Sequence, residues 1–138
     1  MKFIKIIMII LTLGILAGCE VAGNLDYSDF KNRQVTKANA MEQVEETYFI
    51  YIYSDGCKFC DEIKQTVLSY ADTGSIKLYL YNFSTYPVET TSDETYSNVG
   101  ATSMLSVRLY GTPTLFKVVD NAITSQYIGY SQVKNQLK

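Results

Sequence analysis

Apolar residues in this chain come in short runs separated by polar turns, a pattern typical of an α/β domain. The run Tyr48–Tyr53 is rich in β-forming side chains and does not alternate with polar residues, which predicts a central strand buried on both faces. After a Ser-Asp-Gly turn, apolar residues recur at three- and four-residue spacing until Gly74, which predicts an amphipathic helix with two cysteines at its start. The apolar positions of this helix are Cys60, Ile63, Val67 and Ala71.

A second strand is predicted at 76–83, where β-branched and aromatic residues are again frequent. Strand, helix and strand in this order imply a parallel pair joined by a right-handed crossover. The runs at 115–119 and 122–128 predict an antiparallel hairpin, because Asp120 and Asn121 between them tolerate the left-handed conformation of a tight turn. The expected sheet is therefore mixed.

Three further helices are predicted from weaker patterns. The first begins at Thr36 as a cap and runs to about Glu46, with Ala38, Met41 and Val44 on its apolar face. The second covers about 98–107, after a loop rich in serine and threonine that starts at Ser84. The third closes the chain, with Ser131 as its cap and with Val133 and Leu137 buried.

The first eighteen residues read as a secretory signal rather than as part of the fold. Lys2 and Lys5 form a short basic head, and the almost wholly apolar run 6–17 follows it. An uncleaved membrane anchor is the alternative, but a bilayer-spanning helix needs about 20 apolar residues. The motif Leu16-Ala17-Gly18-Cys19 resembles a bacterial lipobox, which implies cleavage before Cys19 and lipidation of that cysteine.

The remaining chain is expected to form a tether and one domain. Residues 19–35 contain the lipidated cysteine and an aperiodic polar stretch that reads as the tether, and 36–138 form the domain. With 138 residues and 47% apolar side chains, the chain is long enough for one core. Because the leader has two lysines and no acidic residue, its removal changes the formal net charge from −2 to −4, and nucleic acid is not an expected partner.

The three cysteines can then be assigned to two roles. If Cys19 carries lipid, Cys57 and Cys60 remain as one pair, in an exported protein that meets an environment where disulfides persist. The first turn of a helix has unpaired N–H groups and a partial positive charge, which favour a thiolate over a thiol. Lys58 acts in the same direction, whereas Asp61 and its acidic neighbours Asp55 and Glu62 act against it.

The order of these elements, with C-x-x-C at the first helix and Gly111-Thr112-Pro113-Thr114 before the hairpin, resembles the thioredoxin superfamily from about Thr36 onward. The resemblance implies a three-layer fold with a central mixed sheet, built as a parallel βαβ unit followed by an antiparallel ββα unit. It also implies that Pro113 is a cis proline facing the cysteines and that Thr112 offers backbone hydrogen bonds to a bound polypeptide. Cys57 would be the exposed nucleophile and Cys60 the buried resolving thiol, with no metal or organic cofactor.

The chain departs from thioredoxin around this motif. Lys58 and Phe59 separate the cysteines, the sequence contains no tryptophan, and Tyr51 stands where thioredoxin has a buried aspartate. The chain is more similar to exported thioredoxin-like lipoproteins and to bacteriocin-accessory proteins of Gram-positive bacteria. This implies a monomeric thiol–disulfide oxidoreductase that is anchored to the membrane and faces the extracytoplasmic side. Its expected substrates are exported proteins bearing thiols or disulfides, and a membrane redox protein is a further candidate partner.

Other interpretations of the cysteine pair remain open. A zinc site needs two further ligands, and the chain has no histidine. A purely structural disulfide closes so small a loop that entropic models assign it little stabilisation, which favours redox use. The main rival is a tethered, non-catalytic binding lipoprotein on the same scaffold. Five of the twelve tyrosines, Tyr48, Tyr51, Tyr53, Tyr79 and Tyr81, lie in the strands predicted at 48–53 and 76–83, where packing explains them.

Overall fold

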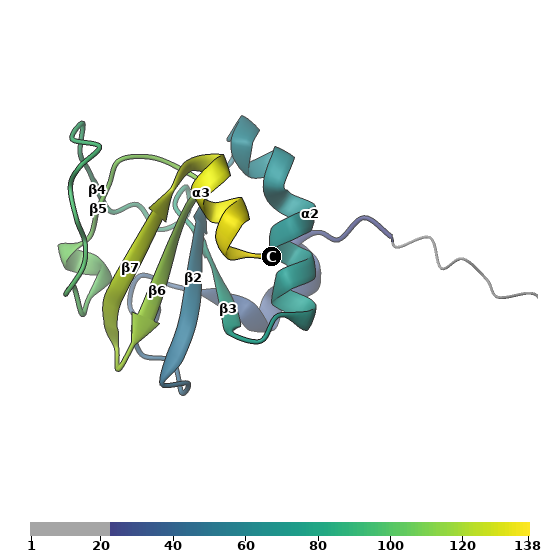
Figure 1. The fold of residues 1–138 in the computed structure, drawn as a ribbon, viewed down its shortest axis with the longest axis horizontal. Coiled ribbons are helices and arrows are strands. Elements are labelled where there is room, and N and C mark those ends of the chain that lie inside the picture. The colour runs from purple at the N-terminus through teal and green to yellow at the C-terminus, as the bar shows by residue number, and fades with distance from the viewer. Residues whose placement is uncertain (1–22) are drawn as a thin grey trace, which may run out of the picture.

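The structure is a computed structural model that describes residues 23–138, and the leader and Cys19 lie outside the described residues (Figure 1). Its centre is a five-stranded sheet in the order β1-β3-β2-β6-β7. The strands are β1 Gln34–Val35, β2 Thr47–Tyr53, β3 Lys77–Asn82, β6 Thr114–Val119 and β7 Ala122–Ile128. β2 pairs in parallel with β3 and antiparallel with β6, so the predicted mixed sheet is confirmed.

The elements that frame the cysteines follow the sequence pattern closely. Every residue of β2 from Tyr48 to Tyr53 is buried, as expected of a strand covered on both faces. α2 spans Lys58–Thr73 and ends at Gly74, with the predicted apolar positions buried. At the hairpin between β6 and β7, Asp120 and Asn121 adopt φ values of 49° and 60°, so the left-handed turn is also confirmed.

Helices cover one face of the sheet. α2, α3 (Gly129–Gln136) and the 3₁₀ segment η2 (Tyr27–Arg33) pack on the face that carries Phe49 and Tyr51. The opposite face, with Tyr48 and Ile50, is covered by the turn around Ala40 and by the segment 84–110. That segment contains β4 (Glu89–Thr90), η3 (Met104–Ser106) and β5 (Arg108–Leu109), and Figure 1 shows it as a separate layer on the far side of the sheet from α2. The third layer is therefore mostly irregular chain.

The helix predicted from Thr36 to about Glu46 is wrong. Residues 37–41 form turns, in which the Thr36 hydroxyl donates to the Asn39 side chain at 3.1 Å instead of accepting from a backbone N–H as a cap. The Asn39 carbonyl accepts from the Gln43 side chain at 2.6 Å, whereas a continuing helix would pair it with the Gln43 backbone N–H. Val44, expected on the buried face, is 94% exposed.

The helix predicted at 98–107 is also wrong, except for the short η3. The Gly100 N–H donates to the Ile123 carbonyl at 2.8 Å, and the Ile123 N–H donates to the Ala101 carbonyl at 2.9 Å. These backbone groups bond to β7 and are therefore not available for hydrogen bonds within a helix.

The two ends of the domain also differ from the prediction. The expected tether 19–35 is folded from Leu25 on, since η2 and β1 pack against the sheet and the Leu25 backbone bonds the Gln65 side chain. The closing helix begins at Gly129 rather than at Ser131, and its cap residue Ile128 makes no side-chain capping bond. Val133 and Leu137 are buried as expected.

Candidate active site

The sheet register brings the cysteine loop and the proline loop together. β2 and β6 are antiparallel with Ile52 opposite Thr114, so the residues just after β2 lie beside those just before β6. Cys57 follows β2, and the Thr112–Pro113 bond, which is cis, precedes β6. The start of α3 joins them, because the Gly129 N–H donates to the Pro113 carbonyl at 2.8 Å. The predicted cis bond is confirmed, and three loops meet at one end of the sheet.

Cys57 is the N-cap of α2. Its Sγ accepts a hydrogen bond from the Cys60 N–H at 3.1 Å, and its carbonyl accepts from the Asp61 N–H at 3.0 Å. The preceding turn is possible because Gly56 adopts a φ of +71°, which costs a residue without Cβ little. The sulfur therefore occupies the place where a capping oxygen usually binds the free N–H groups of a helix.

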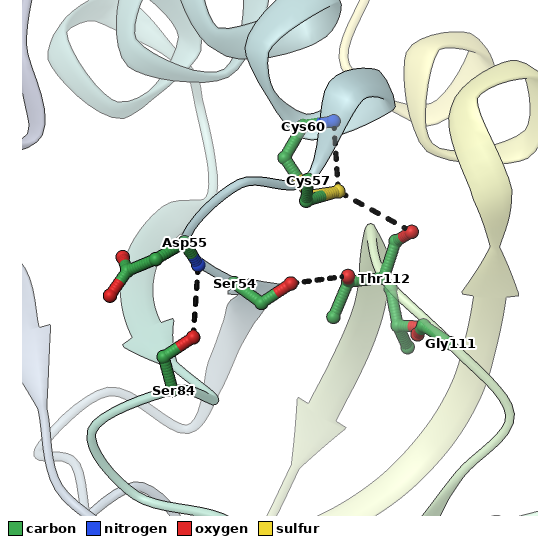
Figure 2. Close-up of a disulfide and its surroundings, with 8 residues drawn as sticks. Ser54, Asp55, Cys57, Cys60, Ser84, Gly111 and Thr112 are labelled. Carbon is green, nitrogen blue, oxygen red and sulfur yellow. Dashed lines mark hydrogen bonds between the residues drawn. A yellow bond between two sulfur atoms is a disulfide. The ribbon is translucent and has the colours of Figure 1, made fainter.

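Cys57 and Cys60 form a disulfide, with their Cα atoms 5.2 Å apart. The two sulfur-bearing residues are not equally accessible, since Cys57 is half-buried and Cys60 is only 1% exposed. The Cys57 Sγ lies 3.6 Å from the Thr112 carbonyl oxygen (Figure 2). In the reduced protein, the Cys57 thiol would have this oxygen as an acceptor.

Side-chain hydrogen bonds hold the two loops in place around this disulfide, as Figure 2 shows. The hydroxyls of Ser54 and Thr112 share a hydrogen bond of 2.8 Å. The Asp55 N–H donates to the Ser84 hydroxyl at 2.9 Å, which ties the cysteine loop to the end of β3. The Thr114 hydroxyl donates to the Gly111 carbonyl at 2.7 Å. The sulfur and the proline loop are thereby fixed relative to each other.

Tyr51 lies in the buried cluster that also contains Cys60. Its side chain is fully buried, and within residues 23–138 neither its hydroxyl nor that of Tyr27 has a hydrogen-bond partner. The two hydroxyls are close enough to affect each other's ionisation but do not meet the geometry of a hydrogen bond. Burial raises the pKa of Tyr51 far above its ordinary value, so the group is a neutral phenol. The Tyr27 ring stacks on Tyr53, with centroids 3.9 Å apart.

Lys58 and Phe59, the residues between the cysteines, point to solvent. Phe59 is 55% exposed, which is high for a large apolar side chain. The predicted site residues Cys57, Cys60, Thr112 and Pro113 thus lie together, Tyr51 lies in the buried cluster with Cys60, and Lys58 and Phe59 stand on the exposed side.

Sequence reasoning missed several residues of this site. The pair of hydroxyls on Ser54 and Thr112, the anchor at Ser84 and the neighbour Tyr110 were not singled out. Ser54 and Thr112 are 58 residues apart in the chain, so no local pattern pairs them. The one available signal was composition, since Ser84 opens the serine- and threonine-rich stretch.

Comparison with solved structures identifies the fold. The structure superposes on a point mutant of thioredoxin from Halobacterium salinarum with a TM-score of 0.53 and 14% identity, covering 75% of this chain and 85% of that one. For thioredoxin f2 of Chlamydomonas reinhardtii the TM-score is 0.50 and the identity 13%, over 75% of this chain and 88% of that one. The fold is thioredoxin-like. No protein-family model and no curated protein sequence matches the chain.

A thioredoxin-like fold with a C-x-x-C disulfide suggests thiol–disulfide redox activity in general terms. Within the described part of the chain, no group of three or more His, Cys, Asp and Glu side chains is arranged to hold a metal ion. In residues 23–138, no helix is long and apolar enough to cross a membrane.

Proposed function

We propose that this protein is a thiol–disulfide oxidoreductase that a lipid on Cys19 holds at the extracytoplasmic side of the cell membrane. It works as a monomer and exchanges disulfides with exported proteins. The lipobox-like motif and the apolar leader support the location. The disulfide between Cys57 and Cys60 at the start of α2 supports the chemistry.

The observation that carries the proposal is the unequal exposure of the two cysteines beside an ordered backbone edge. Cys57 is half-buried at the surface, and Cys60 is covered by the core. The Thr112 carbonyl, 3.6 Å from the Cys57 Sγ, stands where an extended polypeptide bound at Cys57 would find a hydrogen-bond partner. One sulfur is therefore placed to meet a substrate, and the other is placed to meet only the first sulfur.

The exchange proceeds in two displacement steps. In the reduced protein, the Cys57 thiolate attacks one sulfur of a substrate disulfide, which breaks the substrate bond, forms a mixed disulfide and releases the other sulfur as a thiolate. The Cys60 thiolate then attacks the Cys57 sulfur, which restores the Cys57–Cys60 disulfide and releases the second substrate thiolate. Two electrons pass to the substrate, and the reverse sequence oxidises a substrate dithiol. A membrane redox partner restores the starting state of the pair.

The test uses full-length protein in detergent, in insulin reduction and in oxidative refolding of a reduced protein. We expect turnover by the wild type in at least one assay and none by Cys57→Ser or Cys60→Ser. Cys60→Ser should accumulate mixed disulfides that mass spectrometry identifies, whereas Cys57→Ser should not, because its remaining sulfur is buried. Absence of turnover in both assays together with no trapped mixed disulfide would favour the non-catalytic binding lipoprotein.

A further inference from the structure

A small hollow opens beside Thr112, on the side of the segment 84–110. Its volume is about 100 Å³. It is lined by Ser54, Phe83, Thr90, Leu109, Tyr110, Gly111 and Thr112. Two of these walls are held together by the short parallel pair of β4 and β5, in which Thr90 lies opposite Leu109. The segment 84–110, predicted as a loop followed by a helix, thus builds one side of the hollow.

The hollow is apolar in character. The hydroxyls of Ser54 and Thr112 bond to each other, so these two polar groups already have a partner. Phe83, Leu109 and the ring of Tyr110 are the apolar members of the lining, and the hydroxyls of Thr90 and Tyr110 are its other polar side-chain groups. Among the described residues, none of those that line the hollow is charged. An occupant therefore gains by burying hydrocarbon rather than by forming an ion pair.

The volume limits the size of the occupant. An apolar cavity of about 150 Å³ holds benzene. A hollow of about 100 Å³ is smaller than that and takes the three or four carbons of an aliphatic side chain, but not an aromatic ring.

The position of the hollow relates it to the disulfide. Thr112 lines the hollow, and its carbonyl oxygen is 3.6 Å from the Cys57 Sγ. An extended peptide advances about 3.3 Å per residue, so a peptide with its cysteine at Cys57 presents a side chain one or two residues away to this hollow. Tyr110, which lines the hollow, is 46% exposed, which is high for a large aromatic side chain and marks this place as a surface for a partner.

We propose that this hollow is a specificity pocket for an aliphatic side chain of the substrate polypeptide, one or two residues from its reacting cysteine. The proposal rests on the proposed function and narrows its substrates from any accessible disulfide to cysteines flanked by valine, leucine or isoleucine. The occupant is a polypeptide, because only a chain continuous with the reacting cysteine reaches both Cys57 and the hollow.

The test uses reduced full-length protein and a series of peptides, each with one cysteine in a disulfide with thionitrobenzoate. Attack on the cysteine sulfur releases the coloured thiolate, which is the better leaving group, so absorbance gives the rate constant of exchange. The residues one and two positions away on each side carry leucine, phenylalanine, lysine or glycine in turn. We expect one position at which leucine gives about a tenfold higher rate than glycine, with no such gain for phenylalanine or lysine.

A variant that fills the hollow tests whether a preference for leucine in the peptide arises from this pocket or from another part of the protein. Thr90 is exposed and lies in a strand, where an aromatic residue is tolerated, so Thr90→Phe is expected to fold and to fill the space. It should abolish the preference for leucine, so that the leucine and glycine peptides react at equal rates. Ser92→Phe is the matched control, since Ser92 is exposed in the same segment and does not line the hollow. That variant should keep the preference.

The outcomes show whether the pocket proposal alone fails or the proposed function fails with it. Equal rates for all peptides, a preference for phenylalanine or lysine, or a leucine preference that survives Thr90→Phe would each overturn the pocket while exchange itself continues. No reaction with any peptide, with Cys57 reduced and open to alkylation, would overturn the proposed function and the pocket with it.

Discussion

The environment of the Cys57 sulfur favours its ionised form more than the bare motif does. The Cys60 N–H points at the Sγ from 3.1 Å, and a hydrogen bond to a charged acceptor is stronger than one to a neutral acceptor. Tyr51, in the buried cluster with Cys60, is a phenol that is neutral at neutral pH, and burial raises its pKa further. A buried carboxylate at that position would have opposed a second negative charge nearby. The Cys60 N–H and the lack of a carboxylate at position 51 thus favour the thiolate, and the Thr112 carbonyl at 3.6 Å, which can accept a hydrogen bond only from the neutral thiol, acts against it.

We therefore predict that reduced Cys57 ionises more readily than a free cysteine, whose pKa is about 8.5, and that the pair is more oxidising than thioredoxin, whose potential is about −270 mV. Whatever stabilises the thiolate stabilises the reduced form. Thiolate absorbance followed across pH and equilibration with glutathione buffers measure the two quantities. A potential at or below that of thioredoxin would mean that Asp55, Asp61 and Glu62 outweigh the helix terminus, and would favour a reductase.

The buried phenol of Tyr51 leads to a second prediction. Its hydroxyl has no partner among residues 23–138, so Tyr51→Phe removes a polar group that was buried without compensation. We expect the free energy of unfolding to change by less than about 0.5 kcal/mol or to rise by up to about 1 kcal/mol.

Tyr81→Phe is the matched control, because the Tyr81 hydroxyl donates to the Tyr86 carbonyl at 2.7 Å. We expect this variant to lose about 1–2 kcal/mol, since one bond is removed and a carbonyl is left unpaired. Urea denaturation of both variants gives the comparison. A loss in Tyr51→Phe as large as that in Tyr81→Phe would show that the Tyr51 hydroxyl has a partner, such as an internal water.

Among the single residues of the site, those that belong to a short sequence motif were predicted. Cys57, Cys60 and Pro113 lie in short motifs that a sequence pattern displays. The bond between Ser54 and Thr112 and the bond from Asp55 to Ser84 join residues 58 and 29 positions apart, and only the sheet register brings them together. A serine or threonine in a loop has too many other uses to be singled out beforehand.

Strands and helices with a continuous apolar pattern were predicted to within a few residues. The two predicted helices that do not form, at 36–46 and 98–107, belong to segments that cover the same face of the sheet. In the second of them, Asn98 is 6% exposed and its side chain bonds the backbone of Arg108 through both its oxygen and its nitrogen, each at 2.9 Å. A side chain that binds backbone competes with helix formation. Periodicity cannot reveal this competition, because the acceptor lies ten residues away.

We predict that Asn98→Ala destabilises the segment 84–110 strongly. It removes the acceptor of the Arg108 N–H and the donor to the Arg108 carbonyl, and it also removes the bond to Gln126. Buried groups without partners cost about 1–3 kcal/mol each, so we expect a loss of at least about 2 kcal/mol in the free energy of unfolding, measured in urea. Thr102→Ala, at an exposed position of the same segment, should stay within about 0.5 kcal/mol. Equal effects of the two variants would contradict the role of Asn98.

For the whole molecule, the early start of the fold shortens the proposed tether. The Leu25 backbone bonds the Gln65 side chain through both its N–H and its carbonyl, and Asp26 pairs with Lys64. The chain enters the domain beside α2, as Figure 1 shows. Five residues lie between Cys19 and Leu25, and the six steps from one to the other span at most about 3.5 Å each, so the proposed lipid on Cys19 would hold the domain within about 20 Å of the bilayer surface. We therefore propose that the substrates are met at the membrane rather than far from it.

Our last prediction follows from that attachment. Cys19→Ala should abolish lipid labelling, block normal processing and release the protein from any membrane attachment that depends on the lipid. The variant should still form the Cys57–Cys60 disulfide and keep its exchange rate with the peptide series, because the contacts that hold the described domain start at Leu25 and the disulfide joins the other two cysteines. Cys57→Ala is the converse control, with the lipid retained and exchange abolished. Metabolic labelling with a fatty acid, membrane fractionation and the peptide assay separate the two functions of cysteine in this chain. Unchanged lipid labelling in Cys19→Ala would contradict the lipoprotein assignment while leaving the redox site intact.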